Sequence, residues 1–386
     1  MKNMNFELTK EEFLNEYQTK KPFLRKKAFE PDLSWDNVDE IISRCDIASQ
    51  DFKLNYNGRV LDKNEYIEKY EDIGLTRYRF IREKFYSFLR NGATVIANKI
   101  SNEPILYKYR REIEHFSGRP TIASLYLAYG NDSSFRAHWD SRDVFVLQFE
   151  GRKKWTLYEP NFDLPLNHQQ SKDMPEYQCP TKPFMEVILE KGDILYVPRG
   201  WWHDPIPLNE PSLHISIGTY PFYPRDYFNW ILNLLTNKDV YSRKDLLSFN
   251  ESLPDLKQFM GSIYGCATNE DIFNVFRSQL EDKVYRTESP LNLNILAKPN
   301  PNNYIPSDAI LDLNIINNVS YNWDYVIING IKVNTSGESK NIISFLINNP
   351  MVKYSVFLEE FIHLGEEKIK KLIFDLCVSD IIGIYK

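Results

Sequence analysis

The sequence predicts a mainly β fold with added α-helices, in which a double-stranded β-helix of the jelly-roll kind precedes a helical region and a small mixed module. Short apolar segments separated by turn residues recur between residues 121 and 218. That pattern is typical of antiparallel strands in a barrel or sandwich. After residue 225 the large apolar residues change to helical spacing, which predicts that the barrel ends before that point.

Six strands are expected in the barrel, each of them a short apolar run bounded by turn signals. They are Thr121–Ala128, Val144–Phe149, Lys154–Tyr158, Met185–Leu189, Ile194–Val197 and Ser212–Gly218. Alternation in the last strand places His214, Ser216 and Gly218 on one face and the aliphatic residues on the other. The segment Pro-Phe-Tyr-Pro at residues 221–224 closes the barrel region.

The most informative motif is His138-Trp139-Asp140, followed 63 residues later by His203. Residues i and i+2 of a strand point to the same face, so His138 and Asp140 can bind one metal ion. Two histidines and one carboxylate on one side of an ion leave the opposite positions open, as non-heme iron(II) oxygenases require. His-x-Asp alone is a weak signal. The downstream segment GDILYVPRGWWH, residues 192–203, makes it a strong one.

His214 is an alternative third ligand. Its face of the predicted strand can line the same interior, which would make it a residue beside the substrate or behind the ligands. A satisfied core histidine is an equally good interpretation. The remaining histidines have no partner at metal-ligand spacing and are assigned no role; they are His115, His168 and His363.

The segments HWDSRDVFVLQFEGRKKWTLYEP, residues 138–160, and 192–218 resemble the JmjC, cupin-like 2-oxoglutarate oxygenases. The nearest resemblance is to the ribosomal oxygenase branch, whose members hydroxylate arginyl or histidyl residues of ribosomal proteins. The resemblance implies that His138, Asp140 and His203 bind iron(II). It also implies that Lys153, just after an expected hairpin turn at 150–152, holds the distal carboxylate of 2-oxoglutarate. By composition alone, Lys153 would be a solvated hairpin residue.

Further residues are implied for the cosubstrate site. Tyr126 and Ser124 match strand positions that line it in the family, although Tyr126 could equally be a core aromatic. Ser124 departs from the pattern, because the branch usually carries asparagine there. His214 and Ser216 complete the expected set. These departures leave the shape of the site, and therefore the substrate, open.

Composition bounds the partners and the compartment. No run of the sequence approaches membrane-spanning length, and the first residues lack the apolar stretch of a signal peptide. Four separated cysteines predict a reducing compartment, with the cytoplasm as the default. The net charge of −6 disfavours nucleic acid and favours a basic protein partner.

Three regions are expected along the chain. Residues 1–222 form the catalytic domain with its amino-terminal helices. Residues 225–296 form a helical region, which in the resembling branch makes a homodimer. Residues 304–386 resemble the winged-helix module that ends the ribosomal oxygenases. That module has no arginine, and its acidic residues outnumber its lysines, so we expect it not to bind DNA.

The sequence therefore predicts an iron(II)- and 2-oxoglutarate-dependent dioxygenase that hydroxylates a protein or peptide side chain, with a ribosomal protein as one candidate substrate. A second enzymatic hypothesis is a tailoring hydroxylase of a peptide natural product. The contrasting class is a non-catalytic cupin-type scaffold that binds a ligand or partner. Turnover of 2-oxoglutarate coupled to oxidation of a peptide would separate an enzyme from a scaffold.

Overall fold

The computed structural model describes residues 4–101, 103–130, 136–283, 286–300, 304–316 and 325–385. The chain divides into two compact units, Met1–Tyr220 and Pro221–Lys386. The first unit contains two β-sheets and the predicted metal ligands. The second contains a group of helices and a small mixed module.

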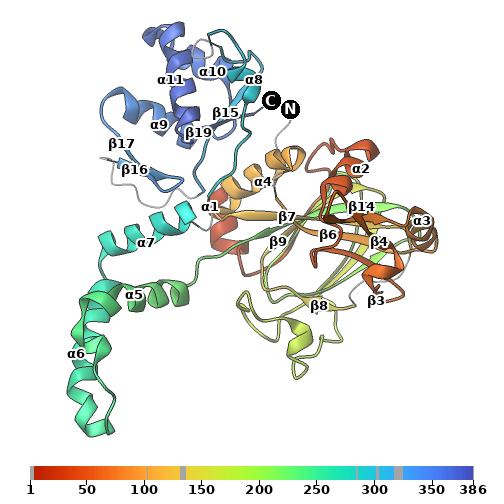
Figure 1. Ribbon diagram of the computed structural model, residues 1–386, viewed down its shortest axis with the longest axis horizontal. Coiled ribbons are helices and arrows are strands. Elements are labelled where there is room, and N and C mark those ends of the chain that lie inside the picture. Colours follow the sequence, from red (N-terminus) through yellow and green to blue (C-terminus); the bar gives the residue numbers. More distant parts are fainter. Residues whose placement is uncertain are drawn as a thin grey trace. The chain divides into compact units, whose positions relative to one another are not determined.

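The larger sheet of the first unit has eight antiparallel strands (Figure 1). In spatial order they are β1 (Phe23–Arg25), β12 (Ile194–Val197), β9 (Val144–Glu150), β14 (Ser212–Thr219), β7 (Thr121–Ala128), β6 (Thr94–Ile100), β2 (Phe52–Tyr56) and β3 (Arg59–Val60). Neighbours along this sheet are mostly distant in sequence, as expected for a jelly roll.

The smaller sheet has four strands, in the order β11 (Met185–Leu189), β10 (Lys153–Tyr158), β13 (Trp202–Pro207) and β8 (His138–Trp139). Side chains of both sheets pack into one hydrophobic cluster, in which Val146 and Leu195 of the larger sheet meet Trp155 and Leu157 of the smaller one. The two sheets therefore face each other. This arrangement is the predicted double-stranded β-helix.

The six predicted barrel strands are all present, with ends that differ by at most one residue. One detail was wrong. The turn at residues 150–152 is not a hairpin, because β9 pairs with β12 and β14 whereas β10 pairs with β11 and β13. The turn carries the chain from one sheet to the other. Gly151 makes this crossing with φ +61°, and its backbone lies so close to Pro211 that a Cβ atom would meet the Pro211 carbonyl.

Helices cover the outer face of the larger sheet. Aromatic side chains from the amino-terminal segment and from α4 pack on Phe145 and Leu147 of β9 to form the main hydrophobic core. The helices of this unit are α1 (Lys10–Glu12), a π-helix (Phe13–Tyr17), α2 (Trp35–Arg44), α3 (Arg82–Arg90) and α4 (Pro104–Ser117), with short 3-10 turns at Lys63–Glu65 and Ser171–Asp173.

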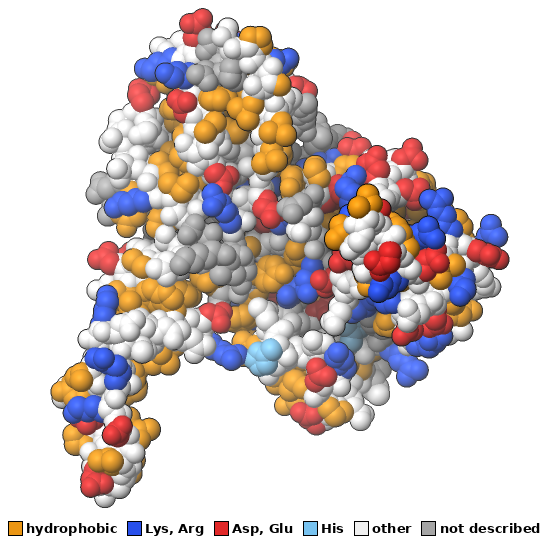
Figure 2. All heavy atoms as spheres, in the orientation of Figure 1, with side chains coloured by type: hydrophobic (Ala, Val, Ile, Leu, Met, Phe, Trp, Pro, Cys, Tyr) orange, Lys and Arg blue, Asp and Glu red, His pale blue; other side chains and the backbone are white. Residues whose placement is uncertain are grey.

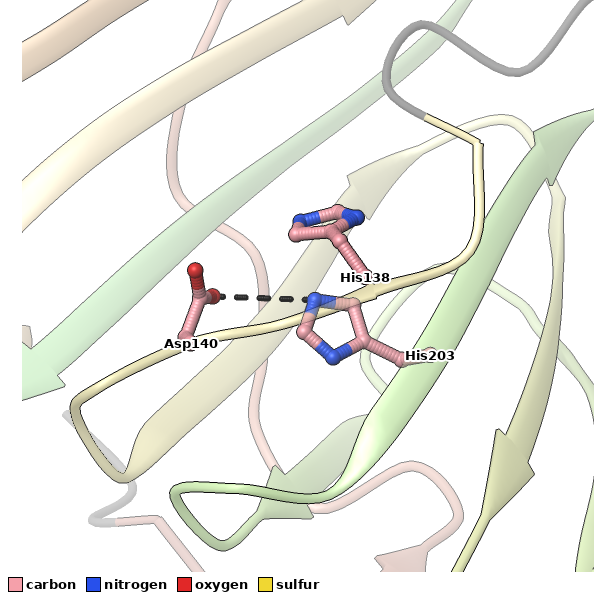
Figure 3. Close-up of side chains that lie close together, drawn as sticks. All are labelled: His138, Asp140 and His203. Carbon is pink, nitrogen blue, oxygen red and sulfur yellow. Dashed lines mark ion pairs between the residues drawn. The ribbon is translucent and has the colours of Figure 1, made fainter. Parts of the chain in front are cut away.

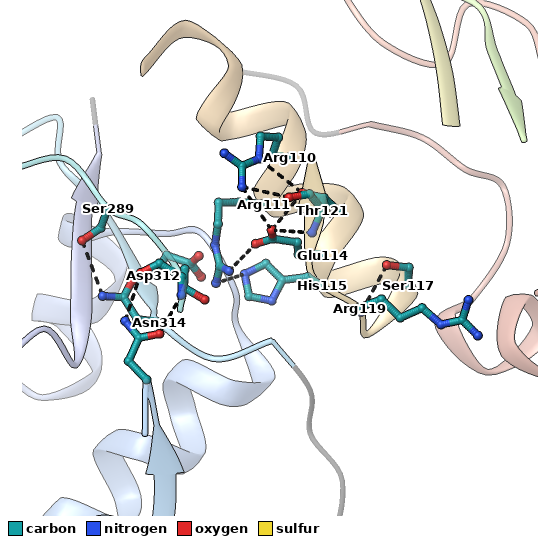
Figure 4. Close-up of polar contacts among 12 residues, drawn as sticks. Arg110, Arg111, Glu114, His115, Ser117, Arg119, Thr121, Ser289, Asp312 and Asn314 are labelled. Carbon is teal, nitrogen blue, oxygen red and sulfur yellow. Dashed lines mark hydrogen bonds and ion pairs between the residues drawn. The ribbon is translucent and has the colours of Figure 1, made fainter. Parts of the chain in front are cut away.

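A buried carboxylate fastens α4 to the beginning of β7 (Figure 4). Glu114, 4% exposed, accepts hydrogen bonds from the backbone N and the Oγ1 of Thr121, at 3.1 and 2.8 Å. Arg111, 2% exposed, donates to the same carboxylate at 2.6 Å. Because a buried charge needs such partners, this network fixes the strand that carries Ser124 and Tyr126.

A separate hairpin, β4 (Ile67–Asp72) and β5 (Leu75–Phe80), was not predicted. Almost all of its side chains are exposed on both faces. Its polar residues do not alternate with apolar ones, so the strand signal in the sequence is absent.

The second unit begins with three helices, α5 (Pro224–Lys238), α6 (Phe249–Ala267) and α7 (Glu270–Lys283), and a 3-10 turn at Val240–Arg243. They share a small core built around Tyr227, Ile231 and Phe276. Many large apolar side chains of this group remain outside that core. Figure 2 shows hydrophobic side chains exposed along α6. The described residues contain no helix that is long and apolar enough to cross a membrane.

The second unit ends in a mixed module with its own core. Its elements are α8 (Leu293–Leu296), β15 (Ile310–Leu313), β16 (Tyr325–Ile328), β17 (Ile331–Asn334), α9 (Glu338–Asn348), β18 (Val352–Lys353), α10 (Tyr354–Glu360), a 3-10 turn (Ile362–Leu364), α11 (Glu366–Val378) and β19 (Ile382–Tyr385). Strands β18, β15 and β19 form one sheet, and β16 and β17 form a hairpin. Residues 301–303 and 317–324 of this region lie outside the described residues.

Candidate metal centre

The structure brings His138, Asp140 and His203 together at one end of the smaller sheet (Figure 3). One candidate ligand atom from each lies within 4.8 Å of the other two. His138 and His203 are cross-strand partners on β8 and β13, and Asp140 follows β8 directly. Nε2 of His203 lies 3.6 Å from Oδ2 of Asp140. Trp139 points away and stacks on Phe162, so the predicted alternation is observed.

Backbone carbonyls orient both imidazoles. Nδ1 of His138 lies 2.9 Å from the carbonyl oxygen of Arg136, and Nδ1 of His203 lies 3.1 Å from that of Trp201. A carbonyl can only accept, so each hydrogen bond requires the proton on Nδ1. Nε2 of each ring then presents its lone pair. This is how proteins commonly fix the tautomer of a metal-binding histidine.

Burial differs across the three candidate ligands. His203 is 4% exposed, and burial, followed by the neighbouring His138, lowers its pKa to about 4. Its imidazole is therefore neutral at neutral pH, which is the form that binds metals. Asp140 is 48% exposed at its side chain. One side of the set thus remains open to solvent.

Lys153 is the second unusual group. It begins β10, is 3% exposed, and has Nδ1 of His214 at 3.4 Å as the only hydrogen-bond partner of its Nζ among the described residues. No carboxylate offsets its charge there. Burial lowers the pKa of Lys153 to about 7. Its neighbour Lys154 is only half-buried, with a side chain 39% exposed, and it pairs with Glu186 at 2.7 Å.

His214 faces Lys153 from the opposite sheet. Burial, and then the charge of Lys153, holds the pKa of His214 well below its usual value, so the ring is neutral. Its Nδ1 accepts from Lys153, which places the proton on Nε2. The ring stacks on Tyr126 at 4.8 Å and 2° between planes. His214 is therefore a direct neighbour of Lys153.

Ser124, Tyr126 and Ser216 lie where the alternation places them. Tyr126 pairs with His214, and Ser124 with Ser216, in the register of β7 and β14. Burial raises the pKa of Tyr126 well above its ordinary value, and the charge of Asp140 adds to this. Tyr126 is therefore stacked on His214 and close enough to Asp140 to be affected by its charge.

Sequence reasoning missed two residues. The ring of Trp155 lies 5.9 Å from that of His203 and 5.6 Å from that of His214, and its buried Nε1 has no partner among the described residues. Asn98 on β6 accepts a hydrogen bond from the hydroxyl of Tyr126. The period-2 pattern of β10 could have identified Trp155. Nothing near Asn98 in the sequence points to the site.

Residues 96–227 match the JmjC domain family. This range is about a third of the chain, and it is similar to the JmjC domain. The matched range runs from β6 to the start of α5 and includes the three candidate ligands, Lys153 and His214.

Several known proteins are similar to the chain over part of their length. The bifunctional lysine-specific demethylase and histidyl-hydroxylase NO66 of Dictyostelium discoideum is 34% identical over 42% of this chain and 31% of its own. The protein of the same name from Culex quinquefasciatus is 27% identical over 73% and 43%. Ribosomal oxygenase 1 of Gallus gallus is 25% identical over 66% and 40%. The chain thus spans less than half the length of these relatives.

The fold is similar throughout to a solved ribosomal oxygenase. The structure of YcfD from Escherichia coli covers 99% of this chain and 99% of its own, with a TM-score of 0.59 at 15% identity. A second YcfD structure, in complex with cobalt and 2-oxoglutarate, gives a TM-score of 0.58 at 14% identity. At these identities the likeness concerns the fold. In sequence and in fold, the chain is similar to proteins that carry the name ribosomal oxygenase.

Proposed function

We propose that this protein is an iron(II)- and 2-oxoglutarate-dependent dioxygenase that hydroxylates a side chain of a protein or peptide. One observation carries the proposal: an open set of two histidines and one carboxylate shares a barrel with a buried lysine that lacks a carboxylate partner among the described residues. The two histidines and the carboxylate suit a divalent metal ion that keeps coordination positions open for other ligands. The buried lysine suits an anionic ligand.

His138, Asp140 and His203 would bind the iron. Their donor set of two nitrogens and one oxygen is typical of non-heme iron(II) enzymes, and the tautomers of both histidines already present Nε2. The affinities of such sites for divalent metal ions follow a general order in which iron(II) lies near the weak end. We therefore expect nickel or zinc to compete with iron for this site during purification.

Lys153 and the side chains around it would bind 2-oxoglutarate. Lys153 would pair with its distal carboxylate, which would restore a full charge to the lysine. His214 would add a neutral Nε2–H donor beside it. Tyr126, Ser124 and Ser216 would line the same site, and the unpartnered Nε1 of Trp155 is a further donor in that neighbourhood.

When bound, iron and 2-oxoglutarate supply the oxidising chemistry, in which dioxygen converts the keto acid to succinate and carbon dioxide and a C–H bond is hydroxylated. The protein's own contribution is positioning. Two backbone carbonyls hold the imidazoles, the lysine fixes the cosubstrate by its far end, and the two sheets exclude water from the buried part of the site. The exposed side at Asp140 remains for the substrate.

The substrate we propose is a basic protein segment, with ribosomal proteins as the first candidates. The similar proteins named above are called ribosomal oxygenases or histidyl-hydroxylases. The chain itself carries a net charge of −6, which favours a partner rich in lysine and arginine. A scaffold role is less well supported, because a binding module has no need of a buried, unpaired lysine beside a metal-ligand set.

We further propose that the helices of residues 225–296 form a homodimer interface and that the last module is winged-helix-like. Exposed apolar side chains on and beside α6 support the interface; they include Leu246, Leu247, Phe249, Met260 and Tyr264, each at least 59% exposed. Contiguous apolar surface of this kind commonly marks a protein–protein contact. The mixed order of strands and helices after residue 304 supports the second assignment.

The experiment that tests the proposed function is succinate formation by the purified full chain with iron(II) and 2-oxoglutarate. We expect His138→Ala, Asp140→Ala and His203→Ala to reduce it to background while circular dichroism shows an intact fold. His363→Ala, in an exposed position of the second unit, is the control and should keep full turnover. Retained turnover in His203→Ala together with its loss in His214→Ala would transfer the third ligand position to His214.

A further inference from the structure

A short chain of contacts connects β6 to the buried lysine. The hydroxyl of Tyr126 donates to Oδ1 of Asn98 at 3.4 Å. The ring of Tyr126 lies parallel to that of His214, and Nδ1 of His214 lies 3.4 Å from Nζ of Lys153. Each of these four side chains thus touches the next. Lys153 is the last member and has no other hydrogen-bond partner among the described residues.

The hydroxyl of Tyr126 depends on Asn98. Buried hydroxyl groups almost always have a hydrogen-bond partner, because an unmatched one costs free energy. Asn98 provides the one hydrogen bond of this hydroxyl within the part of the chain that the structure describes. Without it, the hydroxyl would have no hydrogen-bond partner among the described residues, and only ring stacking would hold the phenol against His214.

The backbone holds Asn98 firmly in place. Its N–H donates to the carbonyl of Asp51 at 2.8 Å. The next residue, Lys99, adopts φ +51° at a β-bulge in the pairing of β6 with β7, and its N–H donates to Oγ of Ser124 at 3.4 Å. Bulges beside functional sites commonly direct a side chain to a particular place. Here the bulge fixes the residue that follows Asn98 on the strand next to Tyr126.

Space is available on the outer side of Asn98. The residue also lines an open groove of about 510 Å³ between the end of α2, the beginning of β2 and the end of β6. A substituted side chain of similar size at position 98 therefore has room on that side. This makes Asn98 a suitable position for substitution without overpacking of the core.

We infer that Asn98 is a positioning residue for the 2-oxoglutarate site, acting through Tyr126 and His214 on Lys153. The inference rests on the proposed function, since it assumes that Lys153 binds the cosubstrate. Asn98 touches neither the metal ligands nor Lys153 in any described contact. Its role is to hold the phenol against His214, so that the imidazole keeps Nδ1 on the lysine.

The test is calorimetric titration of 2-oxoglutarate into the manganese(II)-loaded full chain. Asn98→Leu and Asn98→Ala remove the acceptor and should weaken 2-oxoglutarate binding about three- to tenfold, the effect of one hydrogen bond. Asn98→Asp keeps an acceptor oxygen and should recover most of the affinity. Manganese(II) affinity should change little in all three. The control is Lys99→Ala, which alters an exposed neighbour at the same bulge and should bind 2-oxoglutarate normally.

A double-mutant cycle with Tyr126→Phe separates positioning from general damage. If Asn98 acts through the phenol, the variant carrying Asn98→Leu and Tyr126→Phe should bind 2-oxoglutarate no more weakly than Tyr126→Phe alone. Additive losses would overturn the inference, as would normal 2-oxoglutarate binding by both Asn98→Leu and Asn98→Ala. A wild-type protein that fails to bind 2-oxoglutarate would instead contradict the proposed function itself.

Discussion

Lys153 shows how a single buried group can serve function at the expense of stability. It is 3% exposed and has one neutral partner among the described residues. A buried cation without an anion is unfavourable in the ligand-free protein. The same feature becomes favourable when a carboxylate arrives, because the two charges then offset each other's desolvation. Such a residue therefore points to an anionic ligand more strongly than an exposed lysine would.

Lys153→Met should stabilise the ligand-free protein and remove its affinity for 2-oxoglutarate. Replacing a buried charge by an apolar side chain of similar length is expected to raise the free energy of unfolding by on the order of 1–4 kcal/mol. Loss of the charged partner should weaken 2-oxoglutarate binding by roughly 2–5 kcal/mol. Denaturant unfolding and calorimetry measure the two quantities.

The matched control is Lys154→Met at the next position. The side chain of Lys154 is 39% exposed and is paired with Glu186, and ion pairs at the surface contribute about 0–1 kcal/mol. The free energy of unfolding and the 2-oxoglutarate affinity of Lys154→Met should both stay close to those of the wild type. A Lys153→Met protein that is less stable than wild type and still binds 2-oxoglutarate would return Lys153 to an ordinary structural role.

The pH dependence of cosubstrate binding follows from the pKa of Lys153, which burial lowers to about 7. A bound carboxylate favours the charged lysine and raises that pKa. Above pH 7 the free protein must therefore take up a proton when 2-oxoglutarate binds, and affinity should fall by up to about tenfold per pH unit. Below pH 7 the lysine is already charged, so the dependence should level off.

Calorimetry of the manganese(II)-loaded protein in buffers of different ionisation enthalpy measures this uptake. We expect about one proton per bound 2-oxoglutarate near pH 8 and almost none near pH 6. The Lys153→Met protein provides the baseline, and at high ligand concentration it should show no uptake. A proton count that stays at zero across this range would mean that Lys153 keeps its charge without the cosubstrate.

The turn between β9 and β10 determines where Lys153 lies. Gly151→Ala should destabilise the fold, because the residue has φ +61° and its new Cβ would come within 2.0 Å of the Pro211 carbonyl oxygen. Gly58→Ala is the matched control, with φ +72° and no atom within 4 Å of the new Cβ. Both carry the cost of a left-handed residue, about 1 kcal/mol.

The difference in the free energy of unfolding between the two alanine variants measures the effect of the close contact with the Pro211 carbonyl. We expect the free energy of unfolding of Gly151→Ala to be lower than that of Gly58→Ala by roughly 1–3 kcal/mol, with weaker 2-oxoglutarate binding in Gly151→Ala alone because Lys153 lies two residues further on. Equal unfolding curves would show that the crossing between the sheets is looser than the structure indicates.

The barrel strands were predictable because each is a short apolar run bounded by turn residues, and the elements without such a run were missed. Strand β13 contains Pro205 and Pro207, and the β4–β5 hairpin is exposed on both faces. The turn at residues 150–152 was assigned to a hairpin because a turn signal does not reveal which strands pair on either side. Local patterns carry the period of an element, whereas pairing depends on the whole barrel.

The approach of His138, Asp140 and His203 to one another could be predicted from local patterns, whereas the place of Asn98 could not. His138 and Asp140 have the spacing of one strand face, and His203 follows a recognisable turn segment. Asn98 reaches the site from a strand that pairs with β7 through a bulge, and no local pattern records that approach. Lys153 required the family resemblance, since its sequence neighbours suggest only an exposed turn.

The exposed apolar side chains of α6 predict a dimer. Phe249→Glu and Tyr264→Glu, at positions 71% and 72% exposed, should convert the protein to a monomer in sedimentation analysis, because a buried unpaired carboxylate is costly at an interface. The control is Ile73→Glu at the tip of the β4–β5 hairpin, 99% exposed, which should leave the dimer intact. A wild-type monomer at micromolar concentration would refute the interface.

The proposed reaction places one oxygen atom from dioxygen on a protein side chain. The most direct measurement is mass spectrometry of proteins from cells grown under heavy-isotope dioxygen, with wild type or Asp140→Ala as the only copy of this protein. We predict at least one peptide, from a basic protein, that carries one heavy oxygen atom in wild-type cells and none in Asp140→Ala cells. Identical peptide masses in the two, with wild type and Asp140→Ala equally abundant, would contradict the claim.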